Sequence, residues 1–182
     1  IVWWNCTCEL PIQASGYRVL VCSWDSRNSV IVVAIMVVRS ENFIQKLMQL
    51  LHEKKVAVEI GKYGYLICKS QEFVQFGRSQ MPYVTLRIEE DELVLKVSTG
   101  VGVTARIAYS YGFEFLKSWN ENHPGMAAHL SHDAIPLCRF AFTPPTTLRG
   151  LKTFVNDVLL PEMCRGSEFC AKFCEGAWKY LD

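Results

Sequence analysis

Hydrophobic and polar residues alternate most clearly over residues 84–97, in a pattern typical of half-buried β-strands. Apolar residues stand at 84, 86 and 88 with polar residues between them, and a second alternating run follows an acidic turn at 90–92. One apolar and one polar face indicate an antiparallel hairpin that packs on the rest of the molecule by one side. The apolar residues are predicted to be buried, and Arg87 and Glu89 to be exposed.

Further stretches have the pattern or composition of β-strands: 17–24, 30–38, 56–60, 63–69, 101–107 and 138–142. Residues 30–38 are apolar throughout, which is typical of a central strand with both faces buried. Residues 101–107 alternate after a turn at Thr99-Gly100, so they are expected to extend the hairpin into a meander. The polar stretch 117–136 is expected to be a loop.

Two segments instead have apolar residues at helical spacing. In residues 41–55 the shared face comprises Phe43, Ile44, Leu47, Leu50 and Leu51. In the second segment, which Thr146 or Thr147 can cap, the shared face comprises Leu148, Leu151, Val155, Val158 and Leu159. Pro161 is expected to end this helix, because proline cannot continue the regular helical ladder of hydrogen bonds.

Together these elements predict an α+β fold, a single domain with a mainly antiparallel, twisted sheet of about seven strands covered by two or three helices. A chain of 182 residues is long enough for one domain with a sizeable core. Residues 1–165 are assigned to this domain, and residues 166–182 form a C-terminal segment that is considered separately.

The composition is that of a folded chain, because half of the residues are hydrophobic and only 20% are charged. The 19 basic residues nearly balance the 18 acidic ones, which leaves a net charge of +1. Proteins that grip a phosphate backbone usually carry a basic surplus, so nucleic acid is not expected as a partner. The longest apolar run, 30–38, has nine residues, whereas a membrane-spanning helix needs about 20, so no membrane span is expected.

The positions of the eight cysteines argue against a full disulfide framework. Cys22, Cys68 and Cys138 fall within apolar strand-like runs, where a cysteine serves as a small hydrophobic packing residue. This usage favours an intracellular protein, cytoplasmic or nuclear. A glycosylation sequon at Asn5-Cys6-Thr7 keeps a secreted protein open as an alternative.

No catalytic motif is recognisable in the sequence, and neither an enzymatic activity nor a cofactor is expected. A metal site is the weak alternative, because His123, His129 and His132 crowd one stretch and imidazoles three residues apart on a helix can share a zinc ion. Their spacing matches no closed zinc signature, so a polar surface loop is the preferred interpretation.

The C-terminal segment, residues 166–182, is rich in aromatic residues. Its candidate binding anchors are Phe169, Phe173, Trp178 and Leu181. One interpretation is a third helix that docks on the sheet. The other is a partner peptide joined by a linker, because Gly166-Ser167-Glu168-Phe169 is the translation of two adjacent common cloning sites. Gly176, a poor residue for a helix interior, mildly favours the peptide.

The sequence therefore predicts a non-enzymatic protein-interaction module, a subunit or adaptor in an intracellular complex. It would bind a short partner segment through an aromatic-anchored groove or by adding a strand to an open sheet edge. The alternative is a small-molecule carrier with an apolar cavity between sheet and helix. A metal- or thiol-dependent enzyme is the third possibility, which a bound ion at the histidine stretch would favour.

Overall fold

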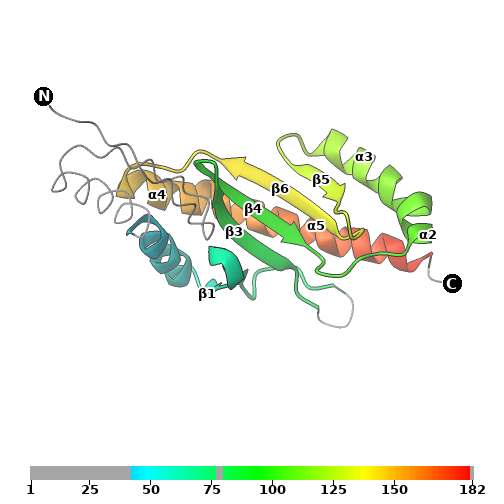
Figure 1. Ribbon diagram of the computed structural model, residues 1–182, viewed down its shortest axis with the longest axis horizontal. Coiled ribbons are helices and arrows are strands. Elements are labelled where there is room, and N and C mark those ends of the chain that lie inside the picture. Colours follow the sequence, from blue (N-terminus) through cyan, green and yellow to red (C-terminus); the bar gives the residue numbers. More distant parts are fainter. Residues whose placement is uncertain (1–41, 77–79, 181–182) are drawn as a thin grey trace, which may run out of the picture.

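The computed structural model describes residues 42–76 and 80–180, and these residues form one antiparallel sheet with helices on one of its faces (Figure 1). The strands of the sheet lie in the order β1-β2-β3-β4-β6-β5. Their bounds are β1 Ala57–Ile60, β2 Leu66–Lys69, β3 Tyr83–Glu89, β4 Glu92–Ser98, β5 Ala127–Leu130 and β6 Pro136–Phe142. An antiparallel α+β fold is confirmed. The strands predicted at 17–24 and 30–38, and Cys22 with them, lie outside the described residues.

Three helical segments flank and cover this sheet. The first helix spans residues 42–53, and a short 3₁₀ turn, η1 (Lys62–Gly64), leads into β2. The second segment runs from α2 (Ala105–Ile107) through the π-helical turn η2 (Ala108–Gly112) into α3 (Phe113–Asn122). The third runs from α4 (Leu148–Phe154) through a second π-helical turn, η3 (Val155–Leu159), into α5 (Leu160–Trp178).

The hairpin of β3 and β4 has the predicted register and orientation. Leu86 pairs with Leu95 on the face toward the helices, and both side chains are fully buried. Arg87 is exposed on the opposite face, as predicted, whereas Glu89 is only partly exposed because it bonds neighbouring basic side chains. A shift of one residue would turn every apolar side chain of the hairpin into water, so the alternation determines this register.

The prediction of a third meander strand at 101–107 is wrong. The edge of β4 where it would pair is occupied by β6, with Val97 opposite Cys138. The chain instead leaves the sheet at Gly100, and the Thr104 hydroxyl accepts a hydrogen bond from the Ile107 amide, which caps a helix. The stretch 117–136 was expected to be a loop, but it contains the end of α3 and all of β5.

The second predicted helix begins at Thr147 as expected, where the hydroxyl accepts a hydrogen bond from the Gly150 amide. Its predicted end is wrong, because the chain continues through Pro161 into α5. In a regular α-helix the proline ring clashes with the carbonyl four residues earlier. The wider π-helical turn η3 lies just before Pro161 and accommodates it. On the predicted face Leu148 and Val158 are exposed, whereas the remaining residues Leu151, Val155 and Leu159 are buried.

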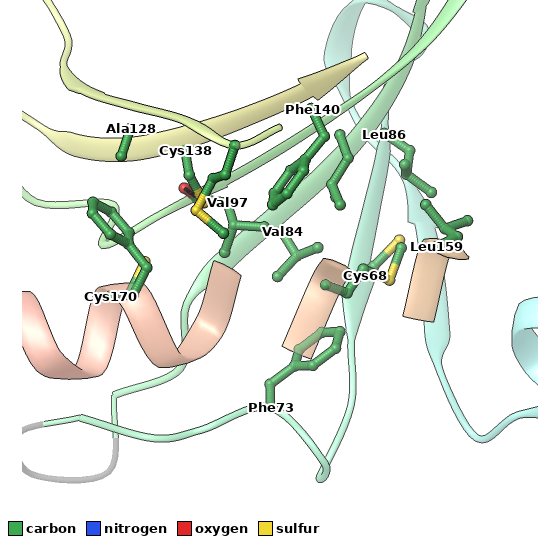
Figure 2. Close-up of a cluster of buried hydrophobic side chains, with 14 of the residues drawn as sticks. Cys68, Phe73, Val84, Leu86, Val97, Ala128, Cys138, Phe140, Leu159 and Cys170 are labelled. Atoms are coloured by element: carbon green, nitrogen blue, oxygen red, sulfur yellow. Dashed lines mark hydrogen bonds between the residues drawn. The ribbon is translucent and has the colours of Figure 1, made fainter. Parts of the chain in front are cut away.

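The hydrophobic core lies between the sheet and the helices that cover it. Helix α5 runs along β4 and β6, and α3 lies beside β5 (Figure 1). Side chains of the sheet, among them Val84, Val97 and Cys138, point toward the helices (Figure 2). The first helix contributes Leu47, and Cys68 and Cys138 are buried packing residues without disulfide bonds, as predicted.

Candidate interaction surface

The predicted anchor residues occupy two different environments along α5. Phe169 and Phe173 are fully buried in the core, where their rings pack against each other and against Phe115 of α3. Trp178, at the last turn of the helix, is 50% exposed. Leu181 lies outside the described residues. Phe169 and Phe173 are therefore core residues of the folded chain, and Trp178 is accessible to a partner.

The tetrapeptide that resembles a cloning scar makes specific contacts inside the fold. Gly166 lies so close to β4 that a Cβ atom there would stand 2.6 Å from Cγ2 of Val97. The Ser167 hydroxyl donates to the Cys164 carbonyl and accepts a hydrogen bond from the Val74 amide at 3.0 Å. In the structure this segment therefore packs as part of α5 against the sheet.

Gly176 makes room for a tyrosine from another element. A Cβ atom at this position would stand 2.0 Å from the hydroxyl oxygen of Tyr111, which belongs to the π-helical turn η2. The Tyr111 hydroxyl donates to the Lys172 carbonyl, and its ring stacks on Tyr180 with centroids 5.5 Å apart. Burial raises the pKa of Tyr111 to about 12, so this phenol remains a neutral donor. The glycine is therefore explained by packing within a long helix.

Exposed aromatic side chains occur on both elements where the end of α5 contacts η2. Tyr109 and Phe113 are 78% and 54% exposed, and their ring centroids lie 5.6 Å apart on the outer side of this segment. Trp178 and Tyr180 are exposed at the end of α5, and Tyr111 connects the two elements through its stack on Tyr180. We call these five residues, Tyr109, Tyr111, Phe113, Trp178 and Tyr180, the aromatic end.

Sequence reasoning missed the part of the aromatic end that η2 and α3 supply. The signal was present, because Thr104 is a good helix cap and Ile107, Tyr111 and Phe115 follow at helical spacing. The alternation over residues 101–107 obscured it, since it led to the prediction of a strand.

The edges of the sheet differ in how open they are to an added strand. At β5 the side-chain amide of Asn120 donates to the Ala128 carbonyl and accepts from the Ala128 amide, both at 2.9 Å. This pair of bonds takes up the edge groups that another strand would need. Within the described part of the chain, β1 is the other edge of the sheet, and its Ile60 is exposed.

The three histidines of the weak metal alternative have separate surroundings. His123 stacks on Trp119 with centroids 4.0 Å apart, and its Nδ1 lies 2.9 Å from the Trp119 carbonyl. His129 is exposed on β5, and His132 is exposed in the loop that follows. Within residues 42–76 and 80–180, no three His, Cys, Asp or Glu side chains gather in a group that could hold a metal ion.

Burial disfavours the reactive thiolate form of the described cysteines. Burial raises the pKa of Cys68 and of Cys138 to about 12 and that of Cys174 to about 11. The same cause raises the pKa of Cys164 and Cys170. A reactive cysteine needs the opposite, a partly exposed and electropositive site that favours the thiolate.

Comparison with models of protein families, with curated proteins and with solved structures gives no match to this chain. In the part of the chain that the structure describes, no helix has the length and apolar character needed to cross a membrane.

Proposed function

We propose that this chain is a non-enzymatic protein-interaction module, a subunit or adaptor of an intracellular complex, that binds a short partner segment through aromatic anchors. The observation that carries the proposal is the aromatic end, where four large aromatic side chains are exposed on two elements that contact each other. Contiguous exposed apolar surface marks interaction sites in soluble proteins, and the paired rings of Tyr109 and Phe113 supply its contiguous part here.

The chemistry of the aromatic end suits protein recognition. Tyrosine and tryptophan combine a large apolar surface with a polar atom, and they dominate the residues whose loss weakens protein interfaces most. The site is also held in place from behind, because Tyr111 packs on Phe173 of the core. A rigid aromatic surface loses little conformational entropy when a partner binds.

The π-helical turn adds a second argument for function. Tyr109 and Tyr111 both lie in η2, and such turns are uncommon in proteins and frequent at functional sites. Tyr111 faces α5, whereas Tyr109 and Phe113 are exposed. The carrier alternative has no comparable support, because α5 packs directly on β4 at Gly166.

Selection of short linear peptides from a displayed library against the folded chain tests this proposal. The selected peptide is then titrated against the chain and its variants. Trp178→Ala and Tyr109→Ala are each expected to weaken binding at least about tenfold, or about 1.4 kcal/mol. Their thermal melts should stay close to that of the parent chain, because both side chains are exposed.

Ile60→Ala is the matched control, since Ile60 is an exposed apolar residue on β1, at the sheet edge opposite β5. It should leave the affinity for the selected peptide unchanged. Failure to select any peptide, or equal affinity for all three variants, would contradict the proposal.

A further inference from the structure

A second surface site lies on the face of the sheet opposite the described helices. It is a pocket of about 420 Å³ lined by Tyr83, Ser98, Gly100, Ser131, Asp133, Ile135 and Leu137. Tyr83, Ser98 and Leu137 are paired across β3, β4 and β6. Their neighbours Val84, Val97 and Cys138 are buried under the helices, so these three side chains point to the other face.

Two loops form the end of this pocket, and they hold each other rigidly. The Val103 amide donates to the Ala134 carbonyl at 3.0 Å, and the Thr99 amide donates to the Pro136 carbonyl at 3.2 Å. A Cβ atom on Gly102 would stand 2.5 Å from the Asp133 carbonyl oxygen, so the loops are in close contact. The pocket is therefore formed before any ligand arrives, and little ordering would be needed on binding.

The lining combines an aromatic ring, an apolar floor and one acid. The ring is that of Tyr83, which is 42% exposed and whose hydroxyl lies 3.5 Å from that of Tyr65. Ile135 and Leu137 are apolar, and the carboxylate of Asp133 is exposed to solvent. A ligand that fits all three features has a flat cationic group at the end of an apolar stem.

Asp133 is the acid of this pocket, and among the described residues no lysine or arginine forms an ion pair with it. The nearby basic side chains Lys96 and Arg139 on this face both bond Glu89, at 2.9 Å and 3.6 Å. Desolvation raises the pKa of Glu89, but the hydrogen bond from Lys96 and the charges of Lys96, Arg139 and Arg87 outweigh it and lower the pKa. Glu89 therefore stays ionised and paired with these cations. The recorded partner of Asp133 is His132, whose Nδ1 lies 3.7 Å from the carboxylate and whose ring is charged only when protonated.

We infer that this pocket binds the guanidinium side chain of an arginine supplied by a partner protein. The planar group stacks on the Tyr83 ring and pairs with Asp133, while the methylene stem covers Ile135 and Leu137. Lysine is less suitable, because its ammonium is a compact, strongly hydrated charge that does not stack. The inference does not depend on the aromatic end, which shares no residue with the pocket.

Three capped tripeptides test the inference: glycine-arginine-glycine, glycine-lysine-glycine and glycine-citrulline-glycine. Each is titrated into isotope-labelled protein while the backbone and methyl signals are followed by NMR. The arginine peptide should shift the signals of Tyr83, Asp133 and Leu137. Citrulline has nearly the same shape without the charge, and its peptide should bind at least about tenfold more weakly. Equal binding of all three peptides, or shifts located elsewhere, would overturn the inference.

Two variants connect the binding to the lining residues. Asp133→Asn and Tyr83→Ala should each reduce the affinity for the arginine peptide several-fold. Asp91→Asn is the matched control, because Asp91 is an exposed acid in the turn at the other end of β3 and β4, and asparagine tolerates its positive φ of 69°. If Asp91→Asn weakens binding as much as Asp133→Asn, the peptide senses only general charge and the pocket assignment is wrong. A negative result in these titrations leaves the aromatic end untouched, so the two proposals fail separately.

Discussion

Two stretches of α5 carry similar side chains and meet opposite environments. From Met163 to Phe173 the helix lies on β4 and β6, and its large apolar residues there are fully buried. Its C-terminal part extends past the end of the sheet (Figure 1), and Trp178 in its last turn and Tyr180 just after it are exposed. The difference comes from what lies opposite each stretch. An aromatic residue in this helix contributes to stability where the sheet covers it and is available for binding where the sheet has ended.

The contacts at the boundary show the same change. Phe169 meets Phe115 and Trp119 of α3 as well as the sheet, so its ring is enclosed on several sides. Tyr180, by contrast, has one described aromatic neighbour, Tyr111. A side chain with one neighbour loses little when it is removed, whereas a core side chain leaves a cavity.

Removal of residues 166–182 should have the largest effect. It deletes four fully or nearly fully buried apolar residues, Phe169, Cys170, Phe173 and Ala177, and uncovers the sheet beneath them. The shortened chain is expected to lose its cooperative thermal transition, measured by circular dichroism. Lys179→Ala, at an exposed position of the same segment, is the control and should leave the melt nearly unchanged. A shortened chain that melts normally and binds the 166–182 peptide in a titration would show the segment to be a tethered partner peptide.

Single truncations in the two stretches should differ by several kcal/mol. Phe173→Ala leaves a cavity in a fully buried site and should lower the free energy of unfolding by about 3–5 kcal/mol. Trp178→Ala removes a half-exposed side chain and should change it by less than about 1 kcal/mol. Chemical denaturation of both variants measures the contrast, and similar losses at the two sites would show that Trp178 is part of the core.

Much of the sheet and two helices could be predicted because each depends on a local pattern. The alternation of β3 and β4 and the helical spacing of residues 42–53 survive in the structure with the expected faces inside. The wrong predictions concern residues whose structure depends on which strands pair in the folded chain. Residues 101–107 alternate as a strand would, but β6 pairs with the edge of β4 where they would have paired. No local pattern in residues 101–107 indicates which segment pairs with this edge of β4.

The candidate site was predictable only in part. Trp178 was singled out from composition, and its exposure follows from the length of α5 relative to the sheet, which the sequence does not display. The length of the helix could not be predicted because of Pro161, since a proline normally ends a helix. The π-helical turn that accommodates this proline has no simple sequence signature. Gly176 was taken to weaken a helix, although its role is to make room for Tyr111 from a segment 65 residues earlier.

Gly176 lies near the boundary between the two stretches, and its replacement gives a small effect that is specific to one contact. Alanine stabilises a helix interior by about 1 kcal/mol relative to glycine, so helix propensity alone predicts that Gly176→Ala stabilises α5. The added Cβ would stand 2.0 Å from the Tyr111 hydroxyl oxygen, so the ring must move away from Phe115, Phe173 and Tyr180. Overpacking of this kind costs about 1–3 kcal/mol, and the net result should be a loss of about 1 kcal/mol.

The sign of this effect should reverse once Tyr111 is removed. In a Tyr111→Ala background the space above Gly176 is empty, so Gly176→Ala should now stabilise the chain by about 1 kcal/mol. The four proteins form a double-mutant cycle whose coupling energy, measured by chemical denaturation, isolates the contact between the ring and the helix. Stabilisation by Gly176→Ala in both backgrounds would mean that Tyr111 does not lie over this glycine. The aromatic end would then lose the residue that connects η2 to α5, and the comparison between the two stretches would rest on α5 alone.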